Sequence, residues 1–252
     1  MSRILTLLYG VTGYAVFFTT FLYMVGFVSG YVTPTTLVTT APDANVATAV
    51  LINLGLIALF GVQHWVMARP GFKSWLTRFV PKAIERTTFM LATCAVLTLM
   101  FWQWRALPGE LWHLDGTAAW IVLGVAALGW LGVLLSTFLI DHFDLFGLRQ
   151  TWLAFRDQPY TQKPFVERSF YRYVRHPLML AFMVAFWAAP IMTVGHLLFA
   201  GGFTVYILAA LFVEERDLVG LHGDAYREYQ RRVPKLLPFG RRGGRETLTQ
   251  AS

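Results

Sequence analysis

Two polar segments hold most of the side chains that could do chemistry, and each lies at the edge of an apolar run. The first is "YRYVRHPLML", residues 171–180, and the second is "EERDLVGLHGDAYREYQRRV", residues 214–233. Arginine, histidine and carboxylate groups of this kind can bind a polar small molecule through charge-assisted hydrogen bonds. At a membrane boundary the same residue types can act only as anchors. Whether they form a binding site therefore depends on whether the two segments lie close together in the fold. The polar groups concerned are Arg175, His176, Glu214, Glu215 and Arg216.

The apolar stretch between these segments predicts that they meet. Residues 178–213 are about twice as long as the roughly 20 residues that cross a bilayer, and Pro190, Gly195 and His196 interrupt them. We therefore expect two spans, Leu178–Val194 and His196–Val213, joined by a tight turn. Antiparallel spans return the chain to the same membrane face, so the two polar segments should form one site.

The composition predicts an all-α polytopic membrane protein. Only 14% of the 252 residues are charged and 56% are hydrophobic, whereas soluble domains contain about 25% charged residues. Together with the predicted hairpin, the long apolar runs give about six transmembrane helices. The other runs are Ile4–Val28, Val46–Met67, Thr87–Trp104 and Gly116–Ile140.

The distribution of basic residues predicts the orientation. With both termini in the cytoplasm, 20 of the 21 Lys and Arg residues lie on the cytoplasmic side and only Arg105 lies outside, which is the positive-inside pattern. The net charge of +7 is thus explained by topology, and nucleic acid is not expected as a partner. We expect a bacterial inner-membrane protein in contact with the lipid bilayer and without an obligate protein partner. The single cysteine, Cys94, excludes CxxC-type zinc or redox motifs.

The two polar segments resemble the signature of the isoprenylcysteine carboxyl methyltransferase superfamily, whose members are integral membrane enzymes that use S-adenosylmethionine. That signature is R-H-P-x-Y, a hairpin, E-E-x-x-L, F-G-x-x-Y-x-x-Y and V-P-x-x-x-P. The chain departs from it at Met179, where the family usually has Tyr, and at His222, often Phe. The matching residues are Arg175, His176, Pro177, Glu214, Glu215, Leu218, Gly223, Tyr226, Tyr229, Val233, Pro234 and Pro238.

Residues 60–238 further resemble the bacterial methanethiol S-methyltransferases, which are relatives of the NnrU-like membrane proteins. The resemblance is carried by "FGVQHWVMARPGFKSWLTRFVPKAIERTTF", "DHFDLFGLRQTWL" and "PYTQKPF". It implies that a small thiol, methanethiol, is methylated to dimethyl sulfide.

The resemblance implies a cofactor site built without a Rossmann turn, because the chain contains no G-x-G-x-x-G. Glu214 and Glu215 would accept hydrogen bonds from the ribose or amino group, and Arg175 or Arg216 would bind the carboxylate. His176, next to Pro177, would contact the nucleoside. Tyr226 or a nearby tryptophan would face the sulfonium through a cation–π contact.

The motif "DHFDLFG", residues 141–147, suggests a base for the thiol. Asp141 and Asp144 are three apart and are expected on one helical face, with His142 beside them. A base would help because an alkyl thiol is mostly protonated at neutral pH. The alternative is that these groups only end the span in water. His64 is a further candidate for lining the substrate pocket, since an ionisable group in a span is costly. No spacing requires a metal.

We expect a four-helix transmembrane region, 1–140, a cofactor-binding region with the membrane hairpin, 141–239, and a disordered tail, 240–252. Three alternatives to methylation of methanethiol remain open. They are a methyltransferase for a lipid or isoprenylcysteine-like substrate, a non-enzymatic NnrU-like accessory protein, and an NADPH-dependent membrane reductase.

Overall fold

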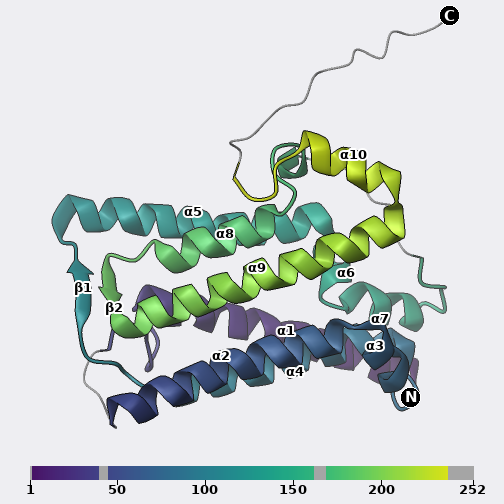
Figure 1. Cartoon of the computed structure of the whole chain (residues 1–252). Helices are drawn as coiled ribbons and strands as arrows, with labels where there is room; N and C mark the ends of the chain where they lie inside the picture. Colours follow the sequence, from purple (N-terminus) through teal and green to yellow (C-terminus); the bar gives the residue numbers. More distant parts are fainter. Residues whose placement is uncertain (1, 40–44, 162–168, 238–252) are drawn as a thin grey trace, which may run out of the picture.

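A computed structural model describes residues 2–39, 45–161 and 169–237 and consists almost entirely of helices (Figure 1). Five of the described helices are long and apolar enough to cross a membrane, which makes the chain an integral membrane protein. These helices match the apolar runs of the sequence. Lipid offers no hydrogen-bond partners to the backbone, so a single segment that crosses it must be a helix. These helices are α1 (Arg3–Ser29), α2 (Val46–Ala68), α4 (Lys82–Gln103), α5 (Gly116–Ile140) and α9 (Val194–His222).

The shorter elements gather at the two ends of the bundle. α8 packs beside α5 and α9, and α10 folds across the end of α9 (Figure 1). The predicted tail 240–252 and Pro238 of the signature lie outside the described residues. The shorter elements are α3 (Pro70–Leu76), α6 (His142–Leu145), α7 (Leu148–Phe155), a 3-10 turn (Ser169–Arg172), α8 (Pro177–Trp187), α10 (Asp224–Arg232), β1 (Glu110–His113) and β2 (Ile191–Thr193).

The hairpin differs from its prediction at its turn. α8 has only 11 residues and ends at Trp187, because Pro190 has no amide hydrogen to continue a helix. The chain then runs extended to Thr193, whose hydroxyl accepts a hydrogen bond from the His196 amide and caps α9. The predicted turn at Gly195 and His196 is therefore wrong, and His196 is buried in the first turn of α9.

A small antiparallel sheet, β1 with β2, is the only sheet in the described residues. It joins the extended part of the hairpin to the connection between α4 and α5, at the end of the bundle away from α10 (Figure 1). The pairing satisfies backbone groups where the hairpin is not helical, which a membrane protein requires. The 11-residue helix α8 spans roughly 17 Å, about half the hydrocarbon thickness, so the predicted span Leu178–Val194 is helical over only part of its length.

Close helix contacts fix how the two halves of the bundle fit. Gly129 and Gly132 of α5 lie against Ala185 and Ala181 of α8, so that a Cβ on either glycine would lie within 3.2 Å of its neighbour. The descending order of these pairs shows that α5 and α8 are antiparallel. Small residues on both helices let their backbones approach closely.

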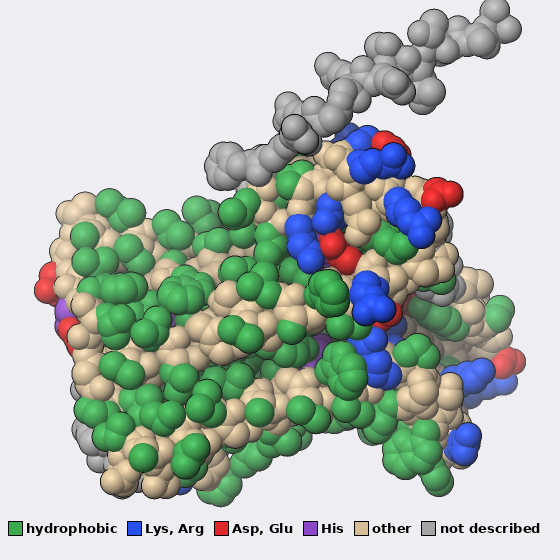
Figure 2. Space-filling model, viewed as in Figure 1, with side chains coloured by type: hydrophobic (Ala, Val, Ile, Leu, Met, Phe, Trp, Pro, Cys, Tyr) green, Lys and Arg blue, Asp and Glu red, His purple; other side chains and the backbone are tan. Residues whose placement is uncertain are grey.

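The core of the bundle is apolar and rich in aromatic rings from α1, α2, α4, α5, α8 and α9. Figure 2 shows a mostly apolar face along the helices, with Lys and Arg side chains gathered at the end where α9 meets α10. α9 is roughly 43 Å long, and the 20 residues before Glu214 alone span roughly 30 Å. Glu214 and Glu215 therefore lie at the edge of the hydrocarbon region.

Candidate functional site

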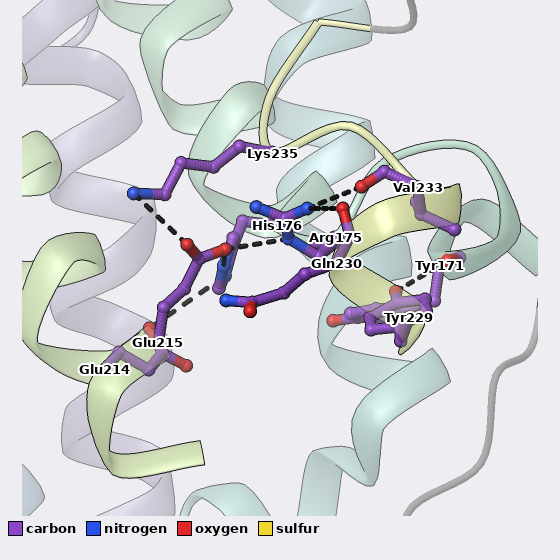
Figure 3. A network of polar contacts seen from close by, with 9 residues as sticks. All are labelled: Tyr171, Arg175, His176, Glu214, Glu215, Tyr229, Gln230, Val233 and Lys235. Carbon is purple, nitrogen blue, oxygen red and sulfur yellow. Dashed lines mark hydrogen bonds and ion pairs between the residues drawn. The ribbon is translucent and has the colours of Figure 1, made fainter. Parts of the chain in front are cut away.

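The two polar segments meet at one end of the bundle, as the hairpin predicted. The Arg175 Nε donates to Glu215 Oε1 at 2.7 Å, and His176 Nε2 lies 3.1 Å from the same oxygen (Figure 3). Pro177 begins α8 and is buried. About 40 residues of chain separate these partners, so only the return of the hairpin brings them together.

Arg175 links three parts of the fold. Besides Glu215, its Nη1 donates to the carbonyls of Gln230 at 2.9 Å and Val233 at 2.6 Å, which end α10 (Figure 3). Lys235 adds a second cation to Glu215, with Nζ 3.4 Å from Oε2. Because these donors are used inside the protein, Arg175 and Glu215 form a supporting ion-pair hub for the site. Arg216 is exposed, with its guanidinium 6.0 Å from the Phe212 ring centroid, and it stays the candidate for a ligand carboxylate.

The V-P-K-L-L segment closes the corner through the backbone. The amides of Arg175 and His176 donate to the carbonyls of Pro234 at 2.9 Å and Lys235 at 3.2 Å. The sequence-predicted signature thus includes residues that hold the site together through main-chain atoms. Lys235 was not singled out from the sequence, although it lies inside the quoted motif.

Tyr226 and Tyr229 share a face of α10, and that face is buried. They are 2% and 1% exposed, and their ring centroids lie 5.7 Å apart. The Tyr229 hydroxyl donates to the Tyr171 carbonyl at 2.6 Å. Burial raises the pKa of Tyr226 to about 12. A role for Tyr226 at the sulfonium has no support in this packing.

His176 Nδ1 and the Glu214 carboxyl group face each other without a hydrogen bond. An ionised Glu215 can only accept, so His176 Nε2 carries the hydrogen of their contact. Burial lowers the pKa of His176, although its hydrogen bond to Glu215 opposes the shift, so the ring is neutral and Nδ1 has a lone pair. Nδ1 lies 3.9 Å from Glu214 Oε2, and the Glu214 side chain is 48% exposed. Burial raises the pKa of the Glu214 carboxyl group, and the charges of Glu215 and Asp217 add to this shift. At 3.9 Å the two groups make no hydrogen bond with each other, so a ligand or solvent can bond to either of them.

The predicted base His142 is enclosed. It is 2% exposed and stacks on Phe138 with ring centroids 4.1 Å apart. Thr137 donates its hydroxyl hydrogen to Leu134, so its oxygen accepts from His142 Nδ1 at 2.7 Å. The other nitrogen, Nε2, then accepts from the Tyr14 hydroxyl at 2.7 Å. Burial lowers the pKa of His142, with the charge of Asp141 opposing. Both nitrogens are used in the neutral ring.

Asp144 is also engaged by its neighbours. Its Oδ1 accepts from Arg149 at 2.9 Å, and its Oδ2 accepts from the Tyr160 hydroxyl at 3.2 Å. The expected common helical face of Asp141 and Asp144 is wrong, because α5 ends at Ile140 and Asp141 has φ 152°. Asp141 instead caps α6, accepting from the Asp144 amide at 3.4 Å.

His64 is the third candidate base. Its ring stacks on Phe60 at 5.4 Å and lies 4.9 Å from Phe89. Thr93 donates to the Phe89 carbonyl, so its oxygen accepts from His64 Nδ1 in a long hydrogen bond of 3.4 Å. His64 Nε2 therefore carries the lone pair, and among the described residues no hydrogen bond uses it. His64, expected from the sequence to line the substrate pocket, thus has an available nitrogen, whereas His142 and Asp144 do not.

A metal site is not supported in the described residues, where no group of three His, Cys, Asp or Glu side chains could hold an ion. The His113–Glu110 contact of 3.2 Å lies on β1, at the other end of the bundle from α10. The chemistry available at the candidate site is therefore that of carboxylates, imidazoles, guanidinium groups and aromatic rings.

Comparisons with known proteins agree on one family. A family model described as "NnrU protein" matches residues 51–240. The chain is 52% identical over 243 residues to a methanethiol S-methyltransferase of Mycobacterium tuberculosis, which covers 96% of this chain and 99% of that protein. It is 50% identical over 243 residues to methanethiol S-methyltransferase 2 of Bradyrhizobium diazoefficiens, covering 96% and 93%. Nurim of Rattus norvegicus is 26% identical over 197 residues, covering 75% of each. No solved structure matches.

Proposed function

The chain belongs to the NnrU protein family together with the methanethiol S-methyltransferases, and on this premise we propose that it methylates methanethiol to dimethyl sulfide with S-adenosylmethionine as donor. The observation that carries the cofactor assignment is the facing pair of His176 Nδ1 and Glu214 Oε2, which lie 3.9 Å apart and make no hydrogen bond with each other. The hydroxyl groups of an adenosine ribose or an amino group can form hydrogen bonds with both.

The remaining residues of the corner fit the donor by charge. Arg216 is exposed on α9 near Phe212, and its guanidinium group can bind the amino-acid carboxylate in a bidentate contact. Arg175, Lys235 and Glu215 hold the ends of α8, α9 and α10 together. Their role is to hold the side chains of His176 and Glu214 in a fixed position relative to each other.

The transfer is an in-line displacement between two sulfur atoms. S-adenosylmethionine supplies an electrophilic methyl group on a positively charged sulfur. The methanethiol sulfur forms a bond to that carbon as the carbon–sulfonium bond breaks, giving dimethyl sulfide and S-adenosylhomocysteine. The thiol proton goes to His64 Nε2 and then to solvent, because His64 has the available lone pair.

The location suits a volatile, apolar substrate. Methanethiol partitions into lipid and reaches His64 from within the bilayer, whereas the charged donor enters from the aqueous end. We propose the bacterial inner membrane, with the basic end of the molecule and both termini in the cytoplasm, as the distribution of Lys and Arg favours.

Purified protein in detergent, given methanethiol and methyl-deuterated S-adenosylmethionine, tests the proposal. We expect dimethyl sulfide carrying one deuterated methyl group in the headspace by mass spectrometry. Methyl transfer only to an isoprenylcysteine analogue would support the larger-substrate alternative. Absence of donor binding in a calorimetric titration would support an accessory protein instead.

A further inference from the structure

The seam between α2 and α9 fixes where α3 begins. A Cβ at Gly61 of α2 would lie 3.2 Å from the Tyr206 ring of α9, and Arg69 Nη1 binds Asp217 Oδ2 at 3.0 Å, so the two helices run parallel. Asp217 lies one turn beyond Glu214, which is at the edge of the hydrocarbon region. α3 therefore begins in the layer of the lipid headgroups, at the same end of the bundle as α10 (Figure 1).

The segment after α2 stays at this face of the membrane. Arg69 is extended, with φ −70° and ψ 140°, and Pro70, which has no amide hydrogen, starts α3. The chain thus leaves the direction of α2 instead of extending that helix into water. Because α4 begins at Lys82 and returns into the bundle, the residues between the two spans remain close to the headgroup layer.

Three aromatic rings of this segment form a patch that the protein leaves partly uncovered. The ring centroids of Phe72 and Trp75 lie 5.2 Å apart, and those of Trp75 and Phe79 lie 5.3 Å apart. Trp75 is 49% exposed and Phe79 is 71% exposed. Aromatic side chains, tryptophan above all, are enriched at the interface between lipid and water. The level of the patch and its residue types therefore both indicate the membrane interface.

The same segment supplies positive charge without any acidic residue. Four basic residues and no Asp or Glu occur in the stretch 69–82. Arg69 is paired with Asp217. The other three, Lys73, Arg78 and Lys82, form no ion pair within the part of the chain that the structure describes, and Arg78 and Lys82 are exposed. Their charges are available to an anionic group outside the protein.

The basic residues of α10 are arranged differently. Arg227 pairs with Asp224 at 2.8 Å and Arg231 pairs with Glu228 at 3.0 Å, so carboxylates on the same helix balance their charges. The two tyrosines of α10 are buried, and the helix presents no exposed ring. Unbalanced positive charge and exposed aromatic rings thus occur together in the stretch 69–82 and not on α10.

We propose that residues 69–82 form a binding surface for anionic phospholipids in the leaflet at this end of the bundle. The rings of Trp75 and Phe79 lie among the headgroups and the first part of the acyl chains. Arg78 and Lys82 bind headgroup phosphates, because basic side chains in this layer attract lipids that have a net negative charge. This surface is independent of the reaction that the chain catalyses.

Lipid binding to the purified protein in detergent, measured by native mass spectrometry, tests this surface. We expect phosphatidylglycerol to bind more tightly than phosphatidylcholine with the same acyl chains. Arg78→Gln combined with Lys82→Gln should reduce this preference by about 10- to 30-fold, or roughly fivefold for each charge removed. The matched control, Arg227→Gln combined with Arg231→Gln, removes the same charge from α10 and should leave the preference within about twofold.

Trp75→Phe tests the position of the rings, because the difference in fluorescence between wild type and this variant reports on Trp75. In vesicles of phosphatidylglycerol and phosphatidylcholine, brominated lipid should quench this difference more strongly than acrylamide in the water does. Quenching by acrylamide alone would place the segment in water and overturn the lipid surface. It would also be overturned if the wild type shows no preference for phosphatidylglycerol, or if both double variants lose the preference equally.

Discussion

Two polar clusters lie at the same end of the bundle, and they differ in what their side chains have left to bind. In the α8–α9 corner, Glu215 is bonded by Arg175, His176 and Lys235, but His176 Nδ1 and the half-exposed Glu214 face each other without a hydrogen bond. In the α6 cluster, His142 and Asp144 have every polar atom engaged.

The comparison teaches that ionisable groups near a membrane surface are not equivalent evidence for a site. A buried polar group must find partners, and where the protein supplies all of them the group stabilises the fold. Where one lone pair or oxygen stays available, the group can act on a ligand. The following changes test this division, from the largest expected effect to the smallest.

Glu215→Ala should cause the largest loss. Arg175 and Glu215 are 10% and 12% exposed, and removing one partner of a buried ion pair costs about 3–5 kcal/mol. We expect a marked fall in thermal stability in detergent and no donor binding by calorimetry. The matched change Glu214→Gln, at a half-exposed position, should leave stability nearly unchanged and weaken donor binding. Equal stability losses for both variants would remove the distinction between hub and ligand group.

His64→Gln should lower turnover by about 10²- to 10⁴-fold, the range for loss of a general base. Donor affinity should stay at the wild-type value, because His64 lies on α2 and makes no contact with Glu214 or His176 in the hydrogen bonds described. Dimethyl sulfide release and calorimetry measure the two effects. Unchanged turnover would show that the thiol proton leaves by another route.

His142→Gln should alter the pH dependence of stability more than catalysis. Burial lowers the pKa of His142, so below about pH 6.5 the unfolded chain takes up a proton that the folded chain resists. His142 therefore makes its whole contribution to the unfolding free energy above that pH. This contribution falls as the pH decreases, by at most about 1.4 kcal/mol per pH unit for one group. The variant should show a shallower fall, and His176 still contributes to the part that remains. Thermal melts at pH 5.5 and 8 provide the measurement.

Asp144→Asn should have the smallest effect. The Arg149–Asp144 pair is 20% and 17% exposed, with a separation of 2.9 Å, and a partly solvated pair contributes about 1 kcal/mol. Turnover should stay within about twofold. A loss of turnover as large as that of His64→Gln would instead restore Asp144 as a candidate base.

The sequence by itself determined the spans and the meeting of the two polar segments. The run Gly116–Ile140 is α5 with the same bounds, because an apolar segment of that length in lipid satisfies its backbone only as a helix. The pairing of His176 with Glu215 followed from hairpin length, since two spans must return to the starting face. The position of the turn was less accurate, because Pro190 ended α8 before the apolar run did.

Only the tertiary structure decided which polar groups keep an atom that is not hydrogen-bonded within the protein. His142 is saturated by Tyr14, which is 128 residues away in the chain, and no local spacing reports that contact. Tyr206 enters the seam because Gly61 lets its ring approach α2, and helix register depends on such packing between distant segments. Hydrophobicity sets where a helix lies along the membrane normal, but side-chain fit sets its neighbours and hence the chemistry available.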